Sequence, residues 1–439
     1  MSHMKFRSTG NRFLTTWKFM RDPFTCYRRW KQDFGESFMV RALNGNVVAT
    51  CNRENIRRVF AARSGEVGQF AVGTIAPLMG GSSLFIVEGE QHRRERAMLS
   101  PSFRGERINN KAEEIREVAM RVARGWQPGQ TMRMMDPSLD VSLEVIIRVV
   151  FGVQSPELVE EFKARIKKFV SSFHPSLAFS RLLQRPLLGL SPWNRFLKAR
   201  SELFELLDEQ IKLRRQSEID SDNMLSGLMH ARYEDGTGVS DKGIRDQLVT
   251  MLLAGHETTQ IAISWAMSWL HRHPEFAERL RAELDKDDSI DAILRSPLLD
   301  GICNESLRIN SIVSDIVRTV REPMEWEEGT LAAGTNIAVA ICLVHEDPEL
   351  YPDPMAFNPD RWSGAKLKPH EFMPFGGGIR RCLGAPLAIL EMKIVIAAWM
   401  QNCRFELPPD RPEHEPVYRR NVTMAPKSGI PLTYTGQRN

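Results

Sequence analysis

The sequence lacks the features that mark metal-stapled, disulfide-stapled and fibrous proteins. Its six cysteines are far apart and include no Cys-x-x-Cys pair, so the ligand spacings of structural zinc and iron–sulfur sites are absent. No segment repeats at a fixed period of 20–50 residues. With 42% hydrophobic and 26% charged residues, the composition excludes intrinsic disorder, a collagen-like repeat and a disulfide-bonded miniprotein.

The sequence also lacks a large excess of either charge. Its 59 Lys and Arg stand against 55 Asp and Glu, which leaves a net charge of +4 over 439 residues, whereas a general nucleic-acid binder carries a much larger basic excess. Scattered thiols and the absence of a secretory signal indicate a reducing compartment. We therefore expect a soluble, cytoplasmic protein with no integral membrane segment. Residues 1–3 are interpreted as a cloning remnant, and because no low-complexity linker divides residues 1–439, we predict a single domain.

The pattern of apolar residues predicts small sheets near both ends of the chain. Two apolar runs between Ser37 and Cys51 are joined by Asn44-Gly45, a dipeptide typical of a two-residue hairpin turn. A second hairpin-like region is predicted for 329–344, where apolar residues alternate around Gly334.

The rest of the chain is predicted to be mainly helical. The spacing of apolar residues favours helices over 137–214, interrupted by the apolar, proline-containing stretch 174–193. This stretch is interpreted as a mobile connection between two helices, with a core-facing loop as the alternative. A further helix is expected to start near Ala385-Pro386.

The longest predicted helix begins at Ser240 and ends before Pro274. Its stretch 248–270 has one formal charge, Glu257, and by length alone could span a membrane. The polar sequence 254–260 in its middle argues against a membrane span. We therefore expect a long helix that runs buried through a globular protein.

Two interpretations remain open for the middle of this helix. Gly255 is unfavourable in a helix by about 1 kcal/mol relative to Ala, but it lets a flat group approach the backbone. Glu257 and Thr258 could then supply a proton and a hydroxyl. Alternatively, the Thr258 hydroxyl bonds to the preceding helical turn and Glu257 forms a structural ion pair.

The segment 375–384 has the sequence FGGGIRRCLG. Its glycines predict a tight turn with exposed amide hydrogens, which stabilise a thiolate at Cys382. Arg380 and Arg381 add positive charge, and the positive end of the following helix faces the sulfur. Metal ligation or nucleophilic chemistry is therefore expected at Cys382 rather than inert packing.

This segment resembles the haem-binding loop of the cytochrome P450 family, Phe-Gly-x-Gly-x-Arg-x-Cys-x-Gly. All of its fixed positions match: Phe375, Gly376, Gly378, Arg380, Cys382 and Gly384. Three further signatures follow the family order. The stretch 254–259 resembles the oxygen-activating helix, 305–308 the Glu-x-x-Arg helix, and 357–362 the segment that holds that pair.

The spacing of the Glu-x-x-Arg residues supports the resemblance. Glu305 and Arg308 are three apart on one helical face and can form an ion pair, to which Arg361 can be added as a buried partner. One departure from the family pattern is visible, because 309–312 has no proline where the family often has one. This departure affects the expected substrate contacts over 312–316.

The resemblance implies heme b (iron protoporphyrin IX), with iron bound by Cys382. The implied cofactor-binding residues are Cys382, Phe375, Ala254 and Gly255, together with His92, Arg96, Arg318 and Arg380 for the propionates. His92 and Arg96 are four apart on one helical face. Arg93 and Arg94 are instead interpreted as part of a solvated basic face.

The resemblance also implies a mainly α fold, a helical triangular prism with minor β-sheets around a buried haem. It implies a haem-thiolate monooxygenase of the soluble, bacterial type that inserts one oxygen atom from O2 into a lipophilic small molecule, most often by hydroxylation. A terpene, a fatty acid and a steroid-like molecule are the candidate substrates. Glu257 and Thr258 would be the catalytic residues that deliver protons. The expected substrate-lining segments are 70–85, 173–188, Leu253, 312–316 and 422–424.

Other functions remain possible for such a chain. A peroxide-driven haem-thiolate enzyme or an isomerase would keep Cys382 without needing Glu257 and Thr258, and a non-catalytic haem-binding protein would keep the ligand loop. The presence of the acid–alcohol pair favours activation of O2 among these alternatives.

The sequence contains no flavin or iron–sulfur motif, so electrons are expected from a separate ferredoxin- or flavodoxin-type donor with its reductase. Basic charge is concentrated between Gln91 and Lys111. The basic residues there are Arg93, Arg94, Arg96, Arg104, Arg107 and Lys111, against Glu95 and Glu106. We expect this segment, with Arg381, to bind an acidic donor. The alternative is a generic solvated basic helix.

Overall fold

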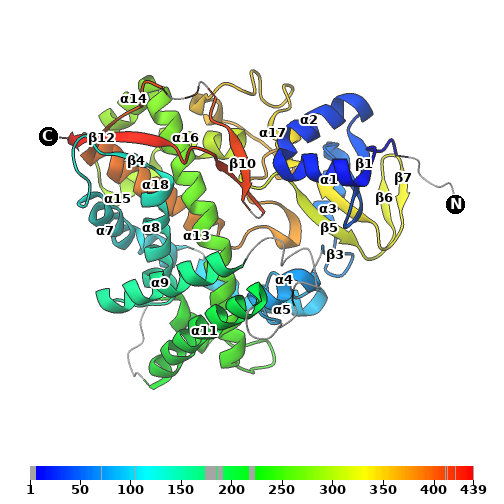
Figure 1. Cartoon of the computed structure of the whole chain (residues 1–439), viewed down its shortest axis with the longest axis horizontal. Helices are drawn as coiled ribbons and strands as arrows, with labels where there is room; N and C mark the ends of the chain where they lie inside the picture. The colour runs from blue at the N-terminus through cyan, green and yellow to red at the C-terminus, as the bar shows by residue number, and fades with distance from the viewer. Residues whose placement is uncertain are drawn as a thin grey trace. The chain divides into compact units, whose positions relative to one another are not determined.

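The computed structural model describes residues 6–70, 72–103, 105–173, 184, 191–216, 223–410, 412, 414–420 and 422–438 (Figure 1). Helices predominate and the sheets are small, as the sequence predicts. The chain forms two compact units. The first unit comprises residues 1–70, 115–139 and 258–439, and the second comprises 71–114 and 140–257. The prediction of a single domain stays a prediction.

The largest sheet of the first unit has five strands in the order β1-β2-β8-β5-β3. These are β1 (Ser37–Ala42), β2 (Gly45–Thr50), β8 (Asn336–Val339), β5 (Ile316–Val320) and β3 (Val67–Gln69). The predicted first hairpin is confirmed, because β1 and β2 pair antiparallel with Ala42 opposite Gly45. Its two turn residues are Leu43 and Asn44 rather than the predicted Asn44 and Gly45, because Gly45 already pairs as the first residue of β2. Gly45 has a φ of 124°, which a side chain would strain.

The predicted second hairpin over 329–344 is wrong. β7 (Gly329–Leu331) pairs with β6 (Met324–Trp326) in a sheet of its own, whereas β8 lies between β2 and β5. Residues 341–345 form helix α17 (Ile341–His345). Gly334 does turn the chain, with a φ of 87°, but each flanking strand pairs with a different partner. Alternation of apolar residues identifies strands and not their partners.

The remaining strands of the first unit form two small sheets. One has the order β4-β12-β9, with β4 at Thr131–Arg133, β12 at Pro431–Gln437 and β9 at Cys403–Glu406. The other pairs β10 (Val417–Arg420) with β11 (Thr423–Pro426).

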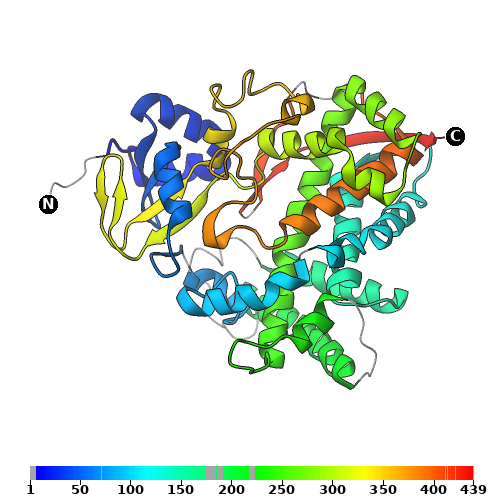
Figure 2. The same cartoon turned by 180° about the vertical axis from the view of Figure 1, so that it is seen from behind.

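Helices α1 (Arg12–Arg21), α2 (Pro23–Phe34), α3 (Arg53–Ala61), α14 (Pro274–Leu284), α15 (Ile290–Arg295), α16 (Pro297–Ile309) and α18 (Ala385–Asn402) belong to the first unit. α18 begins at Ala385 as predicted and packs against α14, α15 and α16 (Figure 2). Aromatic rings of Tyr27 and Trp30 from α2 pack together at a centroid distance of 5.9 Å, and Trp30 packs on Phe38 of β1 at 6.1 Å. This core fixes α2 on the five-stranded sheet.

The second unit is helical. It contains α4 (Val72–Met79), α5 (Gly89–Leu99), α6 (Glu106–Asn109), α9 (Pro156–Ser172), α11 (Pro192–Gln216) and α12 (Met224–His230). α9 and α11 pack together through Phe169 and Phe196, whose ring centroids are 5.7 Å apart. The predicted connection over 174–193 lies almost wholly outside the described residues.

Helices α7 (Ala112–Ala123), α8 (Met135–Val145) and α13 (Asp241–Arg272) contribute residues to both units. The predicted long helix is confirmed in α13, which has 32 residues. Ser240 caps its start by accepting a hydrogen bond from the Gly243 N–H at 3.1 Å, and Pro274 follows its end. Among the described helices, none is both long and apolar enough to cross a membrane.

Candidate active site

The cysteine loop is a tight turn that favours glycine at its centre. Gly376 and Gly378 have φ values of 67° and 65°, in the left-handed region that side chains disfavour. A Cβ on Gly378 would lie 2.6 Å from the backbone oxygen of Phe60, at the end of α3. The Cys382 N–H donates to the Phe375 oxygen at 2.9 Å and closes the turn. The loop is therefore held closely against α3, and Cys382 within it is exposed.

Cys382 differs from the other five cysteines of the chain in its exposure. It is exposed, whereas Cys26, Cys51, Cys303, Cys342 and Cys403 are buried. Burial raises the pKa of Cys303 and of Cys403 to about 12. The pKa values of the Cys26 and Cys51 thiols are raised for the same reason. Cys382 is therefore the thiol of this chain whose position suits metal ligation.

Two cations approach each other beside the loop. Arg318 of β5 donates to the Gln69 side-chain oxygen at 3.0 Å and to the Val317 oxygen at 2.9 Å. Burial, and then the nearby charge of Arg380, lower the pKa of the Arg318 guanidinium to about 10. An anion between these cations would relieve both effects. The donor set therefore fits the propionates of a haem.

Glu305 is the centre of a buried hydrogen-bond network, as the sequence predicts. Its carboxylate accepts from Arg308 at 2.8 and 2.9 Å, from Arg361 Nε at 2.8 Å and from Trp362 Nε1 at 2.9 Å. The Asn358 N–H completes the set at 3.1 Å. Glu305 and Arg308 are both 0% exposed, so the carboxylate meets charged and neutral donors in place of water.

The motif of the long helix is helical throughout. Ala254, Gly255 and Glu257 belong to the second unit and Thr258 to the first. A Cβ on Gly255 would come within 3.0 Å of Ile146 Cδ1 in the second unit, so glycine gives α13 a close approach there. Glu257 is buried and Thr258 is half-buried. Their catalytic role stays a prediction.

His92 and Arg96 lie one turn apart on α5, and His92 is buried. The neighbouring Arg93 pairs with Glu90 at 2.6 Å and with Glu234 at 3.3 Å. Arg94 pairs with Asp235 at 2.6 Å and lies over the Tyr233 ring. Arg93 and Arg94 therefore lie on the solvated face that the sequence predicts, and carboxylates already neutralise part of the basic segment.

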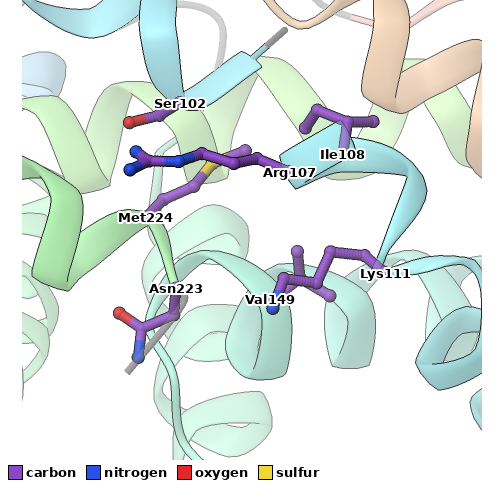
Figure 3. Close-up of a pocket in the computed structure, with 7 residues that line it drawn as sticks. All are labelled: Ser102, Arg107, Ile108, Lys111, Val149, Asn223 and Met224. Carbon is purple, nitrogen blue, oxygen red and sulfur yellow. The ribbon is translucent and has the colours of Figure 1, made fainter. Parts of the chain in front are cut away.

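The second unit contains a small pocket of about 20 Å³ (Figure 3). It is lined by Ser102, Arg107, Ile108, Lys111, Val149, Asn223 and Met224. Arg107 and Ile108 come from α6 and Met224 from α12 (Figure 3). Such a volume holds about one water molecule, so this pocket is too small for a lipophilic substrate.

One of the residues predicted to bind the electron donor, Arg104, lies outside the described residues.

Two of the predicted substrate-lining segments meet in the first unit. The Met424 N–H of β11 donates to the Ile312 oxygen at 2.7 Å, and the Arg419 guanidinium of β10 reaches Ser314 Oγ at 3.5 Å. Where the family often has a proline, Asn310 accepts from Trp269 Nε1 at 2.5 Å. Most of the predicted lining segment 173–188 lies outside the described residues.

A groove of about 580 Å³ opens beside the cysteine loop in the first unit. Its lining comprises Pro297, Asp300 and Asn304 of α16, several residues between Trp362 and Phe372, and Gly376 and Arg381 of the loop. Lys368 and Arg381 are exposed, while the Asp300 carboxylate is bound by the buried Lys393 at 2.9 Å. The two exposed cations therefore dominate the charge of this groove. The sequence contains no signal for it, because its walls come from segments far apart in the chain.

A cysteine presented by a glycine loop beside two cations is suited to hold haem iron by its thiolate, as in haem-thiolate proteins. This chain belongs to the cytochrome P450 family, whose family model matches residues 11–432. A Mycobacterium tuberculosis protein named cytochrome P450 138 is 30% identical over 405 residues, which cover 91% of this chain and 89% of the relative. Cytochrome P450 135B1 of Mycobacterium bovis is 32% identical over 441 residues, which cover 98% and 88%.

Solved structures show the same fold. The retinoic acid-bound cyanobacterial CYP120A1 superposes with a TM-score of 0.85 at 24% identity, covering 99% of both chains. The haem domain of cytochrome P450DA gives 0.87 at 20% identity, covering 99% of this chain and 97% of that one. The predicted fold class, the haem b cofactor and the class of enzyme are confirmed: the protein is a cytochrome P450 monooxygenase.

Proposed function

We propose that this monooxygenase hydroxylates a lipophilic small molecule, that Cys382 is its haem ligand, and that a separate protein supplies its electrons. The observation that carries the proposal is the cysteine loop, in which backbone turns at Gly376 and Gly378 present an exposed Cys382 next to Arg380. Bound haem supplies the activation of O2 and the insertion of one oxygen atom, and a thiolate ligand favours O–O cleavage.

Named side chains would bind the haem, contact its macrocycle and deliver protons. Arg318 and Arg380 would bind the haem propionates, and His92 and Arg96 of α5 are the further propionate ligands that the family resemblance implies. Phe375, Ala254 and Gly255 would contact the flat macrocycle, and Glu257 and Thr258 would each supply a proton-donating group for delivery of protons to bound oxygen. General acid–base groups of this kind contribute about 10²–10⁴-fold to a rate.

Apolar side chains support a lipophilic substrate. The predicted lining segments are largely apolar, and two of them, 312–316 and 422–424, are joined by the backbone hydrogen bond from Met424 to Ile312. The solved CYP120A1 structure is retinoic acid-bound, and retinoic acid is a lipophilic carboxylic acid. We therefore add such acids to the terpenes, fatty acids and steroid-like molecules to be tested. Spectral titration of the Soret band with these compounds identifies the substrate class.

The ligand assignment is tested by the carbon monoxide complex of the reduced protein. The wild type should have the strongly red-shifted Soret band of a thiolate ligand, and Cys382→Ser should lose it. Cys26→Ser, which changes a buried cysteine, should keep the band. A red-shifted band in Cys382→Ser would contradict the assignment.

The proton-delivery role is tested by coupling of electrons to product. Thr258→Ala should still bind haem and substrate but release most electrons as hydrogen peroxide. Thr259→Ala, at the adjacent position of α13, is the matched control and should stay coupled. A fully coupled Thr258→Ala would favour the alternative in which its hydroxyl only bonds to the preceding turn.

The electron donor is proposed to be an acidic ferredoxin- or flavodoxin-type protein that binds at the groove beside the cysteine loop. Lys368 and Arg381 supply complementary charge. Reversing both to Glu should slow reduction, and raising the salt should do the same, because the screening length shrinks from about 10 Å at 0.1 M to 3 Å at 1 M. Arg107→Glu tests the segment that the sequence predicts, and Arg12→Glu on α1 is the control. If the reduction rate changes neither with salt nor in the double variant Lys368→Glu/Arg381→Glu, the proposed docking surface is contradicted.

Peroxide-driven chemistry, isomerisation and haem binding without turnover are separated by one measurement. Only a monooxygenase consumes NADPH through a reductase and donor in proportion to a hydroxylated product.

A further inference from the structure

His345 lies outside every sequence motif that carries the family resemblance, yet both of its ring nitrogens are engaged. It ends α17 and is 0% exposed. Its Nε2 accepts a hydrogen bond from the Met373 N–H at 3.0 Å, and its Nδ1 lies 3.1 Å from Ser311 Oγ. A backbone N–H can only donate, so Nε2 is unprotonated and Nδ1–H donates to Ser311. The network thereby selects one tautomer of a neutral imidazole.

One end of this hydrogen-bond chain reaches the Glu305 network. Ser311 Oγ donates to the Arg308 oxygen at 3.4 Å, and the Arg308 guanidinium donates to the His345 oxygen at 2.8 Å. The same guanidinium binds Glu305. The ring and the main chain of His345 are therefore both tied to the Arg308 end of α16.

The other end reaches the cysteine loop. Met373 is buried, and its oxygen accepts from the Gly376 N–H at 3.0 Å, where the loop begins to turn. The Phe375 oxygen then accepts from the Cys382 N–H. A displacement of Met373 would consequently be passed to the turn that carries the cysteine.

The surroundings of His345 keep the ring neutral and in place. The Phe372 ring packs against it at a centroid distance of 5.5 Å and the Tyr351 ring at 6.4 Å. Burial and the charge of Arg308 lower the pKa of His345 to about 3. Nε2 therefore stays an acceptor at every pH at which the enzyme would be assayed.

We propose that His345 is a positioning residue that anchors the start of the cysteine loop through the Met373 N–H and so holds the Cys382 thiolate in its iron-binding position. This inference rests on the proposed assignment of Cys382 as the ligand. Residues that hydrogen-bond behind a metal ligand orient it, and their loss weakens ligation without removing the ligand itself.

The test is the carbon monoxide difference spectrum of the reduced holoenzyme. His345→Phe keeps an aromatic ring but leaves the buried Met373 N–H without an acceptor. Part of the reduced, carbon monoxide-bound enzyme will lack the red-shifted thiolate band. We expect the ratio of this fraction to the fraction with the band to be about tenfold or more higher in His345→Phe than in the wild type. His345→Gln provides a carboxamide oxygen for the same N–H and should restore the wild-type ratio at least in part. Ser311→Ala should raise this ratio less, because it removes the hydrogen bond at His345 Nδ1 but leaves Nε2 to accept from the Met373 N–H.

The matched control is His271, a second neutral histidine in the first unit. The residue is half-buried but its ring Nε2 is buried, its Nδ1 lies 2.7 Å from the Met267 oxygen, and its ring packs on Phe405. His271→Phe should lower the midpoint of thermal unfolding but leave the spectral ratio unchanged. Equal ratios in His345→Phe and His271→Phe would overturn the proposal, as would a failure of His345→Gln to improve on His345→Phe. If His345→Phe yields no holoenzyme, the same spectral ratio is measured in Ser311→Ala and His345→Gln. A wild-type ratio in Ser311→Ala would then overturn the proposal.

The outcome also separates this inference from the assignment of the ligand. A wild-type enzyme without the red-shifted band would refute Cys382 as the thiolate. A wild-type band that persists unchanged in His345→Phe would refute only the anchoring role.

Discussion

Two Glu–Arg pairs of this chain have the same sequence spacing and opposite surroundings. Glu305 and Arg308 of α16 lie three residues apart and 2.8 Å from each other, with both side chains 0% exposed. Glu90 and Arg93 of α5 are also three apart and 2.6 Å from each other, with side chains 64% and 51% exposed. Spacing and distance alone would assign the two pairs the same importance.

Burial and the number of partners separate them. Around the α5 pair, water competes for every hydrogen bond and salt screens the attraction, so such pairs add little stability. Around Glu305, the donors of Arg308, Arg361, Asn358 and Trp362 replace water, so removing one partner strands a buried charge. The same Glu-x-x-Arg spacing therefore makes a structural centre on one helix and a solvated surface on another.

The largest expected effect comes from removing the centre of the buried network. Glu305→Ala leaves Arg308 and Arg361 without their carboxylate, which costs about 3–5 kcal/mol. We expect no accumulation of haem-loaded protein, measured as Soret absorbance per unit of purified chain. Glu90→Ala is the matched control and should load haem like the wild type. A stable, haem-loaded Glu305→Ala would mean that the network is dispensable.

A smaller effect is expected when the charge is kept and the geometry is changed. Arg361 donates to Glu305 at 2.8 Å and to the backbone oxygens of Pro352 and Asp353 at 3.1 and 3.3 Å. Lysine cannot make these bonds together, so Arg361→Lys should lower the free energy of unfolding by about 2 kcal/mol. Denaturant titration measures it, and Arg93→Lys on α5 should leave the unfolding curve unchanged. Equal curves for both variants would remove the distinction between the two regions.

Acid should affect the interior through its histidines. Burial of the ring lowers the pKa of His271 to about 4, whereas an unfolded histidine has a pKa of about 6.5. Between these values the unfolded chain binds the extra proton, so the stabilising effect of a neutral ring is present above pH 6.5 and is lost as the pH falls. The stability difference between wild type and His271→Phe should therefore shrink by up to about 1.4 kcal/mol per pH unit between pH 6.5 and the folded pKa of about 4. Unfolding curves at pH 7 and pH 5 measure this, and a pH-independent difference would contradict it.

The smallest effect is expected for the exposed pair itself. Glu90→Ala should shift the thermal unfolding midpoint slightly at low salt, and 1 M salt should abolish even that shift, because screening removes most of an exposed attraction. A shift that survives 1 M salt would show that α5 is held by its surface ion pairs.

Local rules predicted much of the fold. The hairpin signal of Asn44-Gly45 located the first hairpin, although its turn lies one residue earlier, at Leu43-Asn44, and Ser240 and Pro274 bounded α13. The hairpin predicted over 329–344 failed because strand pairing depends on distant partners: β8 takes its neighbours from β2 and β5.

Side-chain contacts were predicted only where both partners lay within one helical turn or within a family motif. Glu305, Arg308 and Arg361 met these conditions, and their network is as predicted. Phe60 against Gly378, and Gln69 beside Arg318, did not meet them. Each of these contacts joins segments that are hundreds of residues apart in the chain, and neither carries a local pattern.

The family, the helical class and the identity of the exceptional cysteine could all be predicted from the amino-acid sequence, because glycine turns, helix caps and the loop motif are local signals. The folded structure was needed to see which charges are buried and which are solvated, and to see that His345 joins Arg308 of α16 to Met373. The physical reason is that burial and hydrogen-bond partnership are properties of surroundings assembled from distant segments. The same Glu and Arg therefore acquire their energetic weight only when the chain has folded around them.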